Sequence, residues 1–236
     1  MAHKTLVGGT AYGITGGKCL VGGTAYSISK GRTFIGGTGY DISFGKPLSS
    51  YAESSIVRIN ENGSPADYYV AKHDYESDLN GSGRTLLVKA NGFGTCKWGD
   101  TTTSARWSTS YVLEYLNGTY KAVLSERIVD LIGTTRYLSK DRYNSSALER
   151  SDPIFLLSIT EMGFGGTEGD ELPNSYIYAN NPVTQKWTRS PALGVGVYYA
   201  DYTGTLRTSP ASSAFTICPV FTLPSSVSVG ENDLIA

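Results

Sequence analysis

The first 45 residues carry one pattern of hydrophobic and polar positions three times. Each 14-residue unit has two apolar residues, a Gly-Gly-Thr segment, a tyrosine two positions later and an isoleucine two positions after that. The spacing is the same in all three units. The units are KTLVGGTAYGITGG, KCLVGGTAYSISKG and RTFIGGTGYDISFG. The apolar pair suits a short strand, the glycines suit a tight reversal, and the Thr-x-Tyr-x-Ile segment alternates as strands do. We therefore predict three β-hairpins that form a meander over residues 1–45.

The tyrosine of each repeat falls at the same position of its unit. These tyrosines are Tyr12, Tyr26 and Tyr40, and Cys19 stands where the other two units have threonine. A segment of this size has little apolar surface to bury and is marginal alone. We therefore expect residues 1–45 to be a docking or assembly module, with the three tyrosines as its candidate docking residues.

Glycine and proline then interrupt the repeat, so residues 46–52 are predicted to be a linker and residues 53–236 a larger domain. In that domain, strand-forming residues at 56–59 and 67–71 flank an Asn-Gly-Ser-Pro segment, which is typical of a β-hairpin. Residues 84–89 predict a further strand after an Asn-Gly-Ser-Gly turn.

Helical periodicity is confined to the middle of the larger domain. Apolar residues on one face predict a first helix over residues 112–116 that stops at Asn117-Gly118. Apolar residues at positions 120, 124, 128 and 131 predict a second helix of about three turns that ends at Gly133.

The last third of the chain predicts strands and loops. Residues 154–159 indicate a buried strand, and a long loop rich in glycine and acidic residues follows over 161–181. Further strands are predicted over residues 194–201, 205–208 and 215–223. The expected fold class is α+β, with two helices beside mostly antiparallel strands.

Composition and charge argue against two classes of partner. The chain has 20 Lys and Arg residues and 21 Asp and Glu residues, for a net charge of −1. It therefore lacks the basic excess that binds nucleic-acid phosphates. No apolar run approaches the roughly 20 residues that cross a bilayer. The first residues also lack the basic and apolar regions of a signal peptide. We expect no nucleic acid partner, no membrane insertion and no secretion.

The three cysteines of the chain are Cys19, Cys96 and Cys218. They are far apart, odd in number and form no Cys-x-x-Cys motif, so we expect three reduced thiols rather than a disulfide framework or a zinc site.

Four blocks of the larger domain resemble an uncharacterised domain family that is frequent in prophages of Gram-positive gut bacteria. The blocks are Asn62-Gly-Ser-Pro65, Trp107 to Tyr120 with Leu116-Asn117-Gly118, Asp152-Pro-Ile-Phe-Leu-Leu-Ser158, and Trp187-Thr-Arg-Ser-Pro191 followed by Cys218-Pro-Val-Phe-Thr-Leu-Pro224. Together they span about residues 53–230. The family often has Arg-Pro where this chain has Cys218-Pro219, and two aromatic residues where it has Lys186-Trp187; these differences concern packing.

The resemblance implies a fold similar to that of C-type lectins and the formylglycine-generating enzyme, and it implies no established activity. The Gly-Gly-Thr-x-Tyr repeat is in turn similar to segments of phage tail-region proteins. We therefore expect a C-type-lectin-like domain preceded by the hairpin meander.

No constellation for catalysis stands out. C-type lectins hold calcium with Glu-Pro-Asn or Gln-Pro-Asp and Trp-Asn-Asp motifs, and only the near match Glu171-Leu-Pro-Asn174 occurs here. The residues that together could hold a cation are Glu168, Asp170, Glu171 and Asn174. We prefer to interpret them as a solvated acidic loop, and His73 as an exposed loop residue. We expect no catalytic residue, no metal ion and no cofactor.

Two residues are expected to anchor the structure and five to offer a contact surface. Trp187 is expected in the core, and the five donors of Arg189 are expected to tie loops together. Tyrosine combines apolar area with a hydroxyl group, which suits recognition, although strand packing is the alternative. The candidate contact surface comprises Tyr176, Tyr178, Tyr198, Tyr199 and Tyr202.

These observations lead to one functional expectation with two alternatives. The chain is expected to be a phage virion structural protein of the tail or baseplate region, made in the bacterial cytoplasm. Residues 1–45 would contact other virion proteins, and the lectin-like domain would bind a glycan or protein of the host surface. A homo-oligomer, most simply a trimer, would cover the free strand edges of the repeat. The alternatives are a capsid decoration or head-fibre protein and a cell-wall glycan-degrading enzyme.

Overall fold

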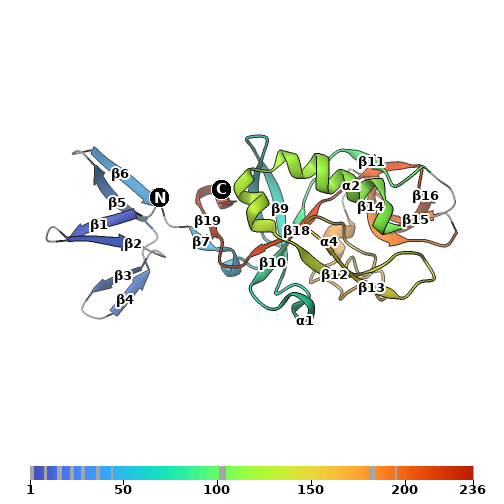
Figure 1. The fold of residues 1–236 in the computed structure, drawn as a ribbon, viewed down its shortest axis with the longest axis horizontal. Helices are drawn as coiled ribbons and strands as arrows, with labels where there is room; N and C mark the ends of the chain where they lie inside the picture. Colours follow the sequence, from blue (N-terminus) through green and yellow to red (C-terminus); the bar gives the residue numbers. More distant parts are fainter. Residues whose placement is uncertain are drawn as a thin grey trace.

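The structure is a computed structural model. It describes the backbone of residues 3–7, 10–14, 18–21, 24–27, 30–35, 38–43, 45–100, 105–180, 184–194 and 196–235. Within these ranges, side chains are described from residue 45 onward, except at residue 231. The described helices and strands make an α+β fold (Figure 1).

Each unit of the N-terminal repeat forms an antiparallel hairpin, as predicted. The pairs are β1 (His3–Val7) with β2 (Thr10–Ile14), β3 (Lys18–Val21) with β4 (Thr24–Ser27), and β5 (Lys30–Ile35) with β6 (Thr38–Ser43). The registers are equivalent, because Tyr12, Tyr26 and Tyr40 lie opposite Thr5, Cys19 and Thr33.

The prediction that the hairpins join into one meander is wrong for the residues that the structure describes. Each hairpin is a separate two-stranded sheet. Only two residues separate the strands of a unit, so the two strands pair with each other at a small entropic cost of loop closure. The glycine pairs predicted to reverse the chain lie outside the described residues.

The first sheet of the larger domain has the strand order β18-β10-β9-β8-β20. Its strands are β8 (Ile56–Glu61), β9 (Ser64–His73), β10 (Arg84–Lys89), β18 (Val220–Pro224) and β20 (Leu234–Ile235). The turn between β8 and β9 consists of Asn62 and Gly63, whose φ angles of 49° and 82° are both left-handed. This is the geometry that Asn-Gly favours in a two-residue hairpin, and the predicted hairpin is confirmed.

The second sheet has the order β11-β17-β14-β15-β16. Its strands are β11 (Thr95–Lys97), β14 (Lys186–Pro191), β15 (Gly196–Ala200), β16 (Leu206–Pro210) and β17 (Ala214–Thr216). The single strand predicted over residues 215–223 is wrong, because the chain leaves this sheet after β17 and enters the first sheet at β18. The carbonyl of Ile217 accepts from the Phe93 amide at 2.7 Å, and that of Pro219 accepts from the Lys89 amide at 3.0 Å.

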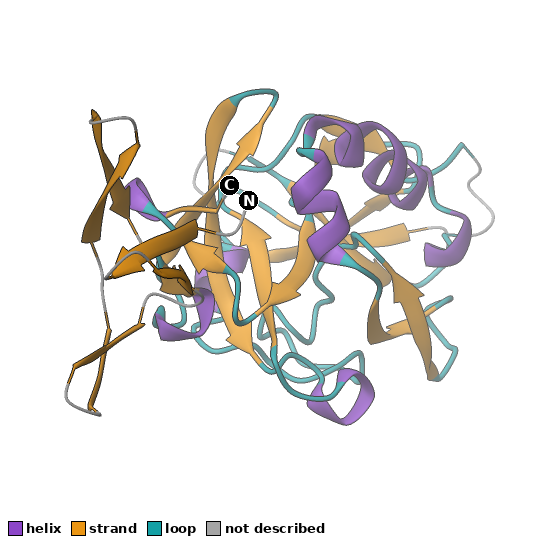
Figure 2. Ribbon diagram, turned by 60° about the vertical axis from the view of Figure 1, so that its left-hand side comes forward, coloured by secondary structure: helices purple, strands orange, loops and turns teal. Residues whose placement is uncertain are grey.

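A helical segment covers one side of the domain (Figures 1 and 2). It contains the 3₁₀ turn η2 (Trp107–Thr109), α2 (Tyr111–Tyr115), the π-helical turn η3 (Leu116–Tyr120), the 3₁₀ turn η4 (Lys121–Val123) and α3 (Glu126–Ile132). The predicted stop at Asn117-Gly118 is wrong. The Asn117 amide group donates to the carbonyls of Leu113 and Ile154, so this residue lies within the helical path instead of capping it.

The second predicted helix is shorter than expected. Leu124 is extended, with φ −79° and ψ 148°, so Tyr120 and Leu124 lie before the helix. Ser125 caps the start of α3 by accepting from the Ile128 amide, and the helix ends at Gly133, with φ 60°, as predicted.

The remaining elements connect these layers. They are β7 (Lys46–Pro47), η1 (Leu48–Ser50), α1 (Ser77–Asn80), β12 (Thr135–Lys140), β13 (Ala147–Asp152), α4 (Tyr176–Ala179), β19 (Ser228–Val229) and η5 (Glu231–Asp233). Strand β7 pairs with β19, and Leu48 is fully buried. Residues 46–52, predicted to be a linker, therefore pack into the domain.

Residues 154–158 are buried, as predicted, but they form no regular strand. Phe155 makes a single β-bridge with Val220. The neighbouring backbone groups bond to side chains: the Ile154 amide donates to Asn117, the Ser158 amide to Glu161, and the Leu156 carbonyl accepts from Arg189. Because side chains satisfy the backbone of this segment, it lies in the core without a strand ladder.

An aromatic cluster fills the interior beside the second sheet. Trp187 is fully buried, and its ring centroid lies 4.5 Å from that of Phe215 and 5.9 Å from that of Trp98. The indole nitrogen of Trp187 donates to the Cys96 carbonyl at 2.9 Å. Trp98 in turn contacts Trp107, with 5.4 Å between centroids. Strand β14 is thus tied to β11 and to η2.

We predict that Trp187→Ala lowers the free energy of unfolding by about 3–5 kcal/mol, because it removes a buried ring and leaves a cavity. Tyr202→Ala is the matched control, since Tyr202 is 60% exposed and its truncation should change stability by no more than about 0.5 kcal/mol. Urea unfolding followed by circular dichroism measures both. A Trp187→Ala protein with the parent midpoint would contradict the core assignment.

Candidate functional site

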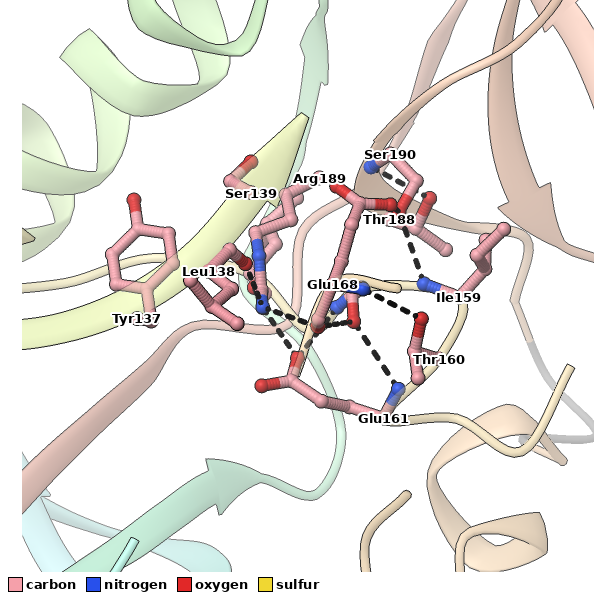
Figure 3. Close-up of polar contacts among 12 residues, drawn as sticks. Tyr137, Leu138, Ser139, Ile159, Thr160, Glu161, Glu168, Thr188, Arg189 and Ser190 are labelled. Carbon is pink, nitrogen blue, oxygen red and sulfur yellow. Dashed lines mark hydrogen bonds and ion pairs between the residues drawn. The ribbon is translucent and has the colours of Figure 1, made fainter. Parts of the chain in front are cut away.

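A buried ion pair joins strand β14 to the loop that follows residues 154–158 (Figure 3). Arg189 on β14 is fully buried and pairs with the carboxylate of Glu161, also fully buried. The same guanidinium group donates to the carbonyls of Leu156 at 2.7 Å and Leu138 at 2.9 Å. It also lies over the ring of Tyr137, 4.8 Å from the centroid. Arg189 thus joins a strand, a hairpin and the core segment 154–158.

The electrostatics of this pair are those of a closed structural contact. Burial has the largest single effect and lowers the pKa of Arg189, but the negative groups around it, Glu161 foremost, together raise that pKa above its ordinary value. Burial and the same carboxylate raise the pKa of Tyr75 well above its ordinary value, and the Tyr75 hydroxyl donates to Glu161. Removing one partner from such a pair typically costs about 3–5 kcal/mol, because the other charge stays buried.

Of the four residues predicted to form a solvated acidic loop, Asp170, Glu171 and Asn174 are exposed, as predicted, and Glu168 is buried. Glu168 is 2% exposed, accepts from the Lys140 amide at 2.8 Å and receives the Ser190 hydroxyl. Asp170 faces Lys72 at 3.5 Å. The other two residues turn elsewhere: Glu171 accepts from Ser175, and Asn174 donates to Ser54.

The four residues suggested for a cation therefore contact different partners. Within the described part of the chain, no group of three or more His, Cys, Asp or Glu side chains is arranged to hold a metal ion. His73 differs from its prediction as well. It ends β9, is half-buried, and its ring nitrogens lie 2.8 Å from the Thr85 hydroxyl and 2.8 Å from the Tyr51 carbonyl.

The five tyrosines proposed as a contact surface divide into two groups. Tyr178 is buried, packs on Tyr69 at 5.9 Å, and burial raises its pKa to about 12. Tyr199 is half-buried between Trp187 and Phe215 in the aromatic cluster. These two residues pack inside the domain, so the surface predicted from the sequence is too large.

The exposed members of that set are Tyr176 and Tyr202, at 66% and 60% exposure. The two segments that carry them are close in space, because Gly204 in the β15–β16 turn approaches the backbone of Asn180, which follows α4. Tyr198 is half-buried, and burial together with the nearby Tyr143 raises its pKa. Tyr143, which is 40% exposed in the β12–β13 turn, was not identified from the sequence.

The turn that presents Tyr202 is held by one carboxylate. Asp201 accepts from the amides of Thr203 and Thr205 at 2.8 and 3.0 Å and from Arg207 at 3.2 Å. The Thr203 hydroxyl is the main cause that lowers the pKa of Asp201 to about 2.

A groove of about 410 Å³ opens between the helical segment and the end of β13. We call it the α2 groove, and its lining residues are Ser108, Thr109, Ser110, Leu113, Glu114, Asn117, Asp152 and Pro153. Three hydroxyl-bearing residues, two acidic residues and an asparagine therefore line a space of the size that small ligands occupy. No spacing in the sequence relates residues 108–117 to 152–153, so sequence analysis missed this site.

Fixed contacts shape the α2 groove. The Asn117 amide group donates to the carbonyls of Leu113 and Ile154, and its oxygen accepts from the Ile154 amide at 3.1 Å. Asp152 accepts through Oδ2 from the Tyr137 hydroxyl at 2.6 Å, and Tyr137 accepts from the Trp107 indole at 2.7 Å. Each wall of the groove is thus tied to the buried core.

We predict that Asp201→Asn removes part of the pH dependence of stability. A carboxyl group whose pKa is lowered on folding stabilises the protein above its unfolded value of about 3.9, and this contribution is lost as pH falls through about 2. The parent should therefore lose more stability than the variant between pH 4 and pH 2. Unfolding midpoints across that range measure the difference, and parallel curves would contradict the assignment.

Comparison with known proteins assigns the larger domain to a family. No curated protein and no solved structure matches the chain. Among the described residues, no helix is both long and apolar enough to cross a membrane. Residues 82–225 match the family described as Domain of unknown function (DUF6273). The matched range includes both carboxylates of the α2 groove and the ion pair of Arg189. This match covers more than half of the sequence, and the chain belongs to the DUF6273 family.

Proposed function

We propose that the chain is a structural and binding protein of a phage particle, located in the tail or baseplate region. In this proposal, the N-terminal hairpins dock onto other virion proteins. The DUF6273 domain has a C-type-lectin-like fold and contacts a glycan or protein on the host surface. The repeat supports the docking role, because three hairpins with the same register present Tyr12, Tyr26 and Tyr40 at equivalent positions.

One observation carries the presentation role. The two ends of the larger domain meet, since β7 pairs with β19 and β8 pairs with β20. These strands lie at the end of the domain that continues into the hairpins, whereas α2 and β14–β16 lie toward the other end (Figure 1). A module attached at one end leaves its opposite end free for a ligand. The α2 groove and the β15–β16 turn are on that free part.

The interior carboxylates favour binding over catalysis. Glu161 and Glu168 are buried in structural hydrogen bonds. Glu61 pairs with Lys89 at 2.8 Å and accepts from the hydroxyl groups of Tyr68 and Tyr120. Carboxylates that accept such hydrogen bonds stabilise the packing of loops, and we assign them no role in catalysis. The surface left for function is the α2 groove and the exposed tyrosines.

We expect the purified chain to be retained saturably on cell walls from Gram-positive bacteria and to release no sugar or muropeptide from them. The measurement is a pull-down titration with chromatography of the supernatant. Released fragments would instead establish the glycan-degrading activity, and a chain that stays in solution with every wall tested would contradict host-surface binding.

We also expect the full chain to form a homo-oligomer, most simply a trimer, through residues 1–45. The free strand edges of three separate hairpins favour association. A chain that lacks residues 1–45 keeps β7 and its partner β19, so it should fold as a monomer that no longer enters particles. Light scattering distinguishes the states. A full chain that is a monodisperse monomer at tens of micromolar would contradict self-assembly.

A further inference from the structure

We propose that the α2 groove is a subsite for a sugar unit that carries a protonated amino group. The inference rests on the proposed function, because it names the chemistry of the host-surface ligand. It goes further in assigning that ligand to one groove and one charge. The groove volume of about 410 Å³ lies within the range of about 300–1,000 Å³ typical of small-ligand sites.

The charge of the lining is the first argument. The groove contains the carboxylates of Glu114 and Asp152, and none of its lining residues is a lysine, arginine or histidine. The nearest arginine in sequence, Arg106, is directed to Asp141 at 3.6 Å. An anionic ligand would therefore meet negative charge without compensation, whereas an ammonium group would meet it favourably.

The second argument is which carboxylate oxygens are available. Glu114 is exposed and has no hydrogen bond or ion pair with any described side chain. Asp152 uses Oδ2 for Tyr137, which leaves Oδ1 to accept from a ligand. An ammonium group has three donors and no acceptor, and charge-assisted bonds to carboxylates are among the stronger hydrogen bonds.

Hydroxyl groups beside the carboxylates favour a sugar over a simple amine. Ser108, Thr109 and Ser110 place three hydroxyls along the same groove, and each can donate or accept. Thr109 is exposed, while the Ser108 hydroxyl is directed to Asp141 and that of Ser110 caps α2. Leu113 and Pro153 add apolar surface against which the carbon face of a sugar ring can pack.

The rigidity of the groove is the third argument. The amide group of Asn117 is fully bonded to backbone, and Asp152 is held through Tyr137 to the Trp107 indole. Side chains fixed before binding lose little entropy when a ligand arrives. The groove is therefore suited to recognise one ring in one orientation.

The test compares two oligosaccharides that differ at the amino group. The full chain is titrated in a calorimeter with the β-1,4-linked tetramer of glucosamine and with the N-acetylglucosamine tetramer, at pH 6 and low salt. We expect the amino form to bind at least tenfold more tightly, and we expect the difference to shrink as salt is raised. Equal affinities for the two tetramers, or no binding of either, would overturn the proposal.

A pair of matched variants places the binding. Glu114→Gln keeps the size of the side chain and should weaken glucosamine tetramer binding about five- to tenfold without changing the melting temperature. Glu126→Gln, in the first turn of α3 and outside the groove, is the control and should bind as the parent does. Parent-like binding by Glu114→Gln would overturn the assignment.

Two further outcomes separate this proposal from the others. Tetralysine offers the same ammonium groups on a peptide, and binding equal to that of the glucosamine tetramer would replace the sugar by a peptide and overturn the proposal. Cell-wall retention that survives Glu114→Gln would leave host-surface binding standing while the groove assignment fails. If the chain binds the glucosamine tetramer but is retained on no cell wall tested, the groove assignment is supported and the proposed function is contradicted.

Discussion

The buried pair of Arg189 and Glu161 is the contact on which the rest of the domain depends. Its guanidinium group lies where the core segment 154–158, the β12–β13 hairpin and strand β14 converge, and it supplies hydrogen bonds that no strand ladder provides there. Two charges taken out of water stabilise a fold only when their remaining hydrogen-bonding groups are satisfied. The carbonyls of Leu138 and Leu156 and the hydroxyl of Tyr75 satisfy most of these groups, whereas the Arg189 Nε has no hydrogen-bond partner among the described residues.

The same arrangement explains why parts of the fold could be predicted and others could not. Alternation and an Asn-Gly turn predicted the β8–β9 hairpin, and the 14-residue period predicted the three N-terminal hairpins, because these features depend on neighbouring residues. The path of residues 154–158 depends on Asn117 and Arg189, which are distant in sequence, as well as on the nearby Glu161. Local patterns therefore indicated burial there correctly and the strand incorrectly.

The candidate site divides in the same way. Tyr202 is exposed in a polar turn and Tyr176 at the start of α4, whereas the burial of Tyr178 and Tyr199 depends on Tyr69 and Trp187 from other elements. Sequence analysis could not predict the α2 groove, because its two walls are joined by tertiary hydrogen bonds, from Asp152 through Tyr137 to Trp107 and between Asn117 and Ile154. A tertiary contact of this kind leaves no periodic trace in the sequence.

The passage of the chain from the second sheet to the first has a consequence for synthesis. Strand β18 completes the first sheet beside β10, and β20 closes its other edge beside β8, although more than a hundred residues separate each pair along the chain. Pairings between such distant segments form slowly, because the entropy of closing a large loop is lost before the contacts that stabilise the pair have formed. While the ribosome is still making residues 220–235, strands β8, β9 and β10 form a sheet with both edges open. Until β18 and β20 pair, the outer edges of β10 and β8 are open to association with another chain.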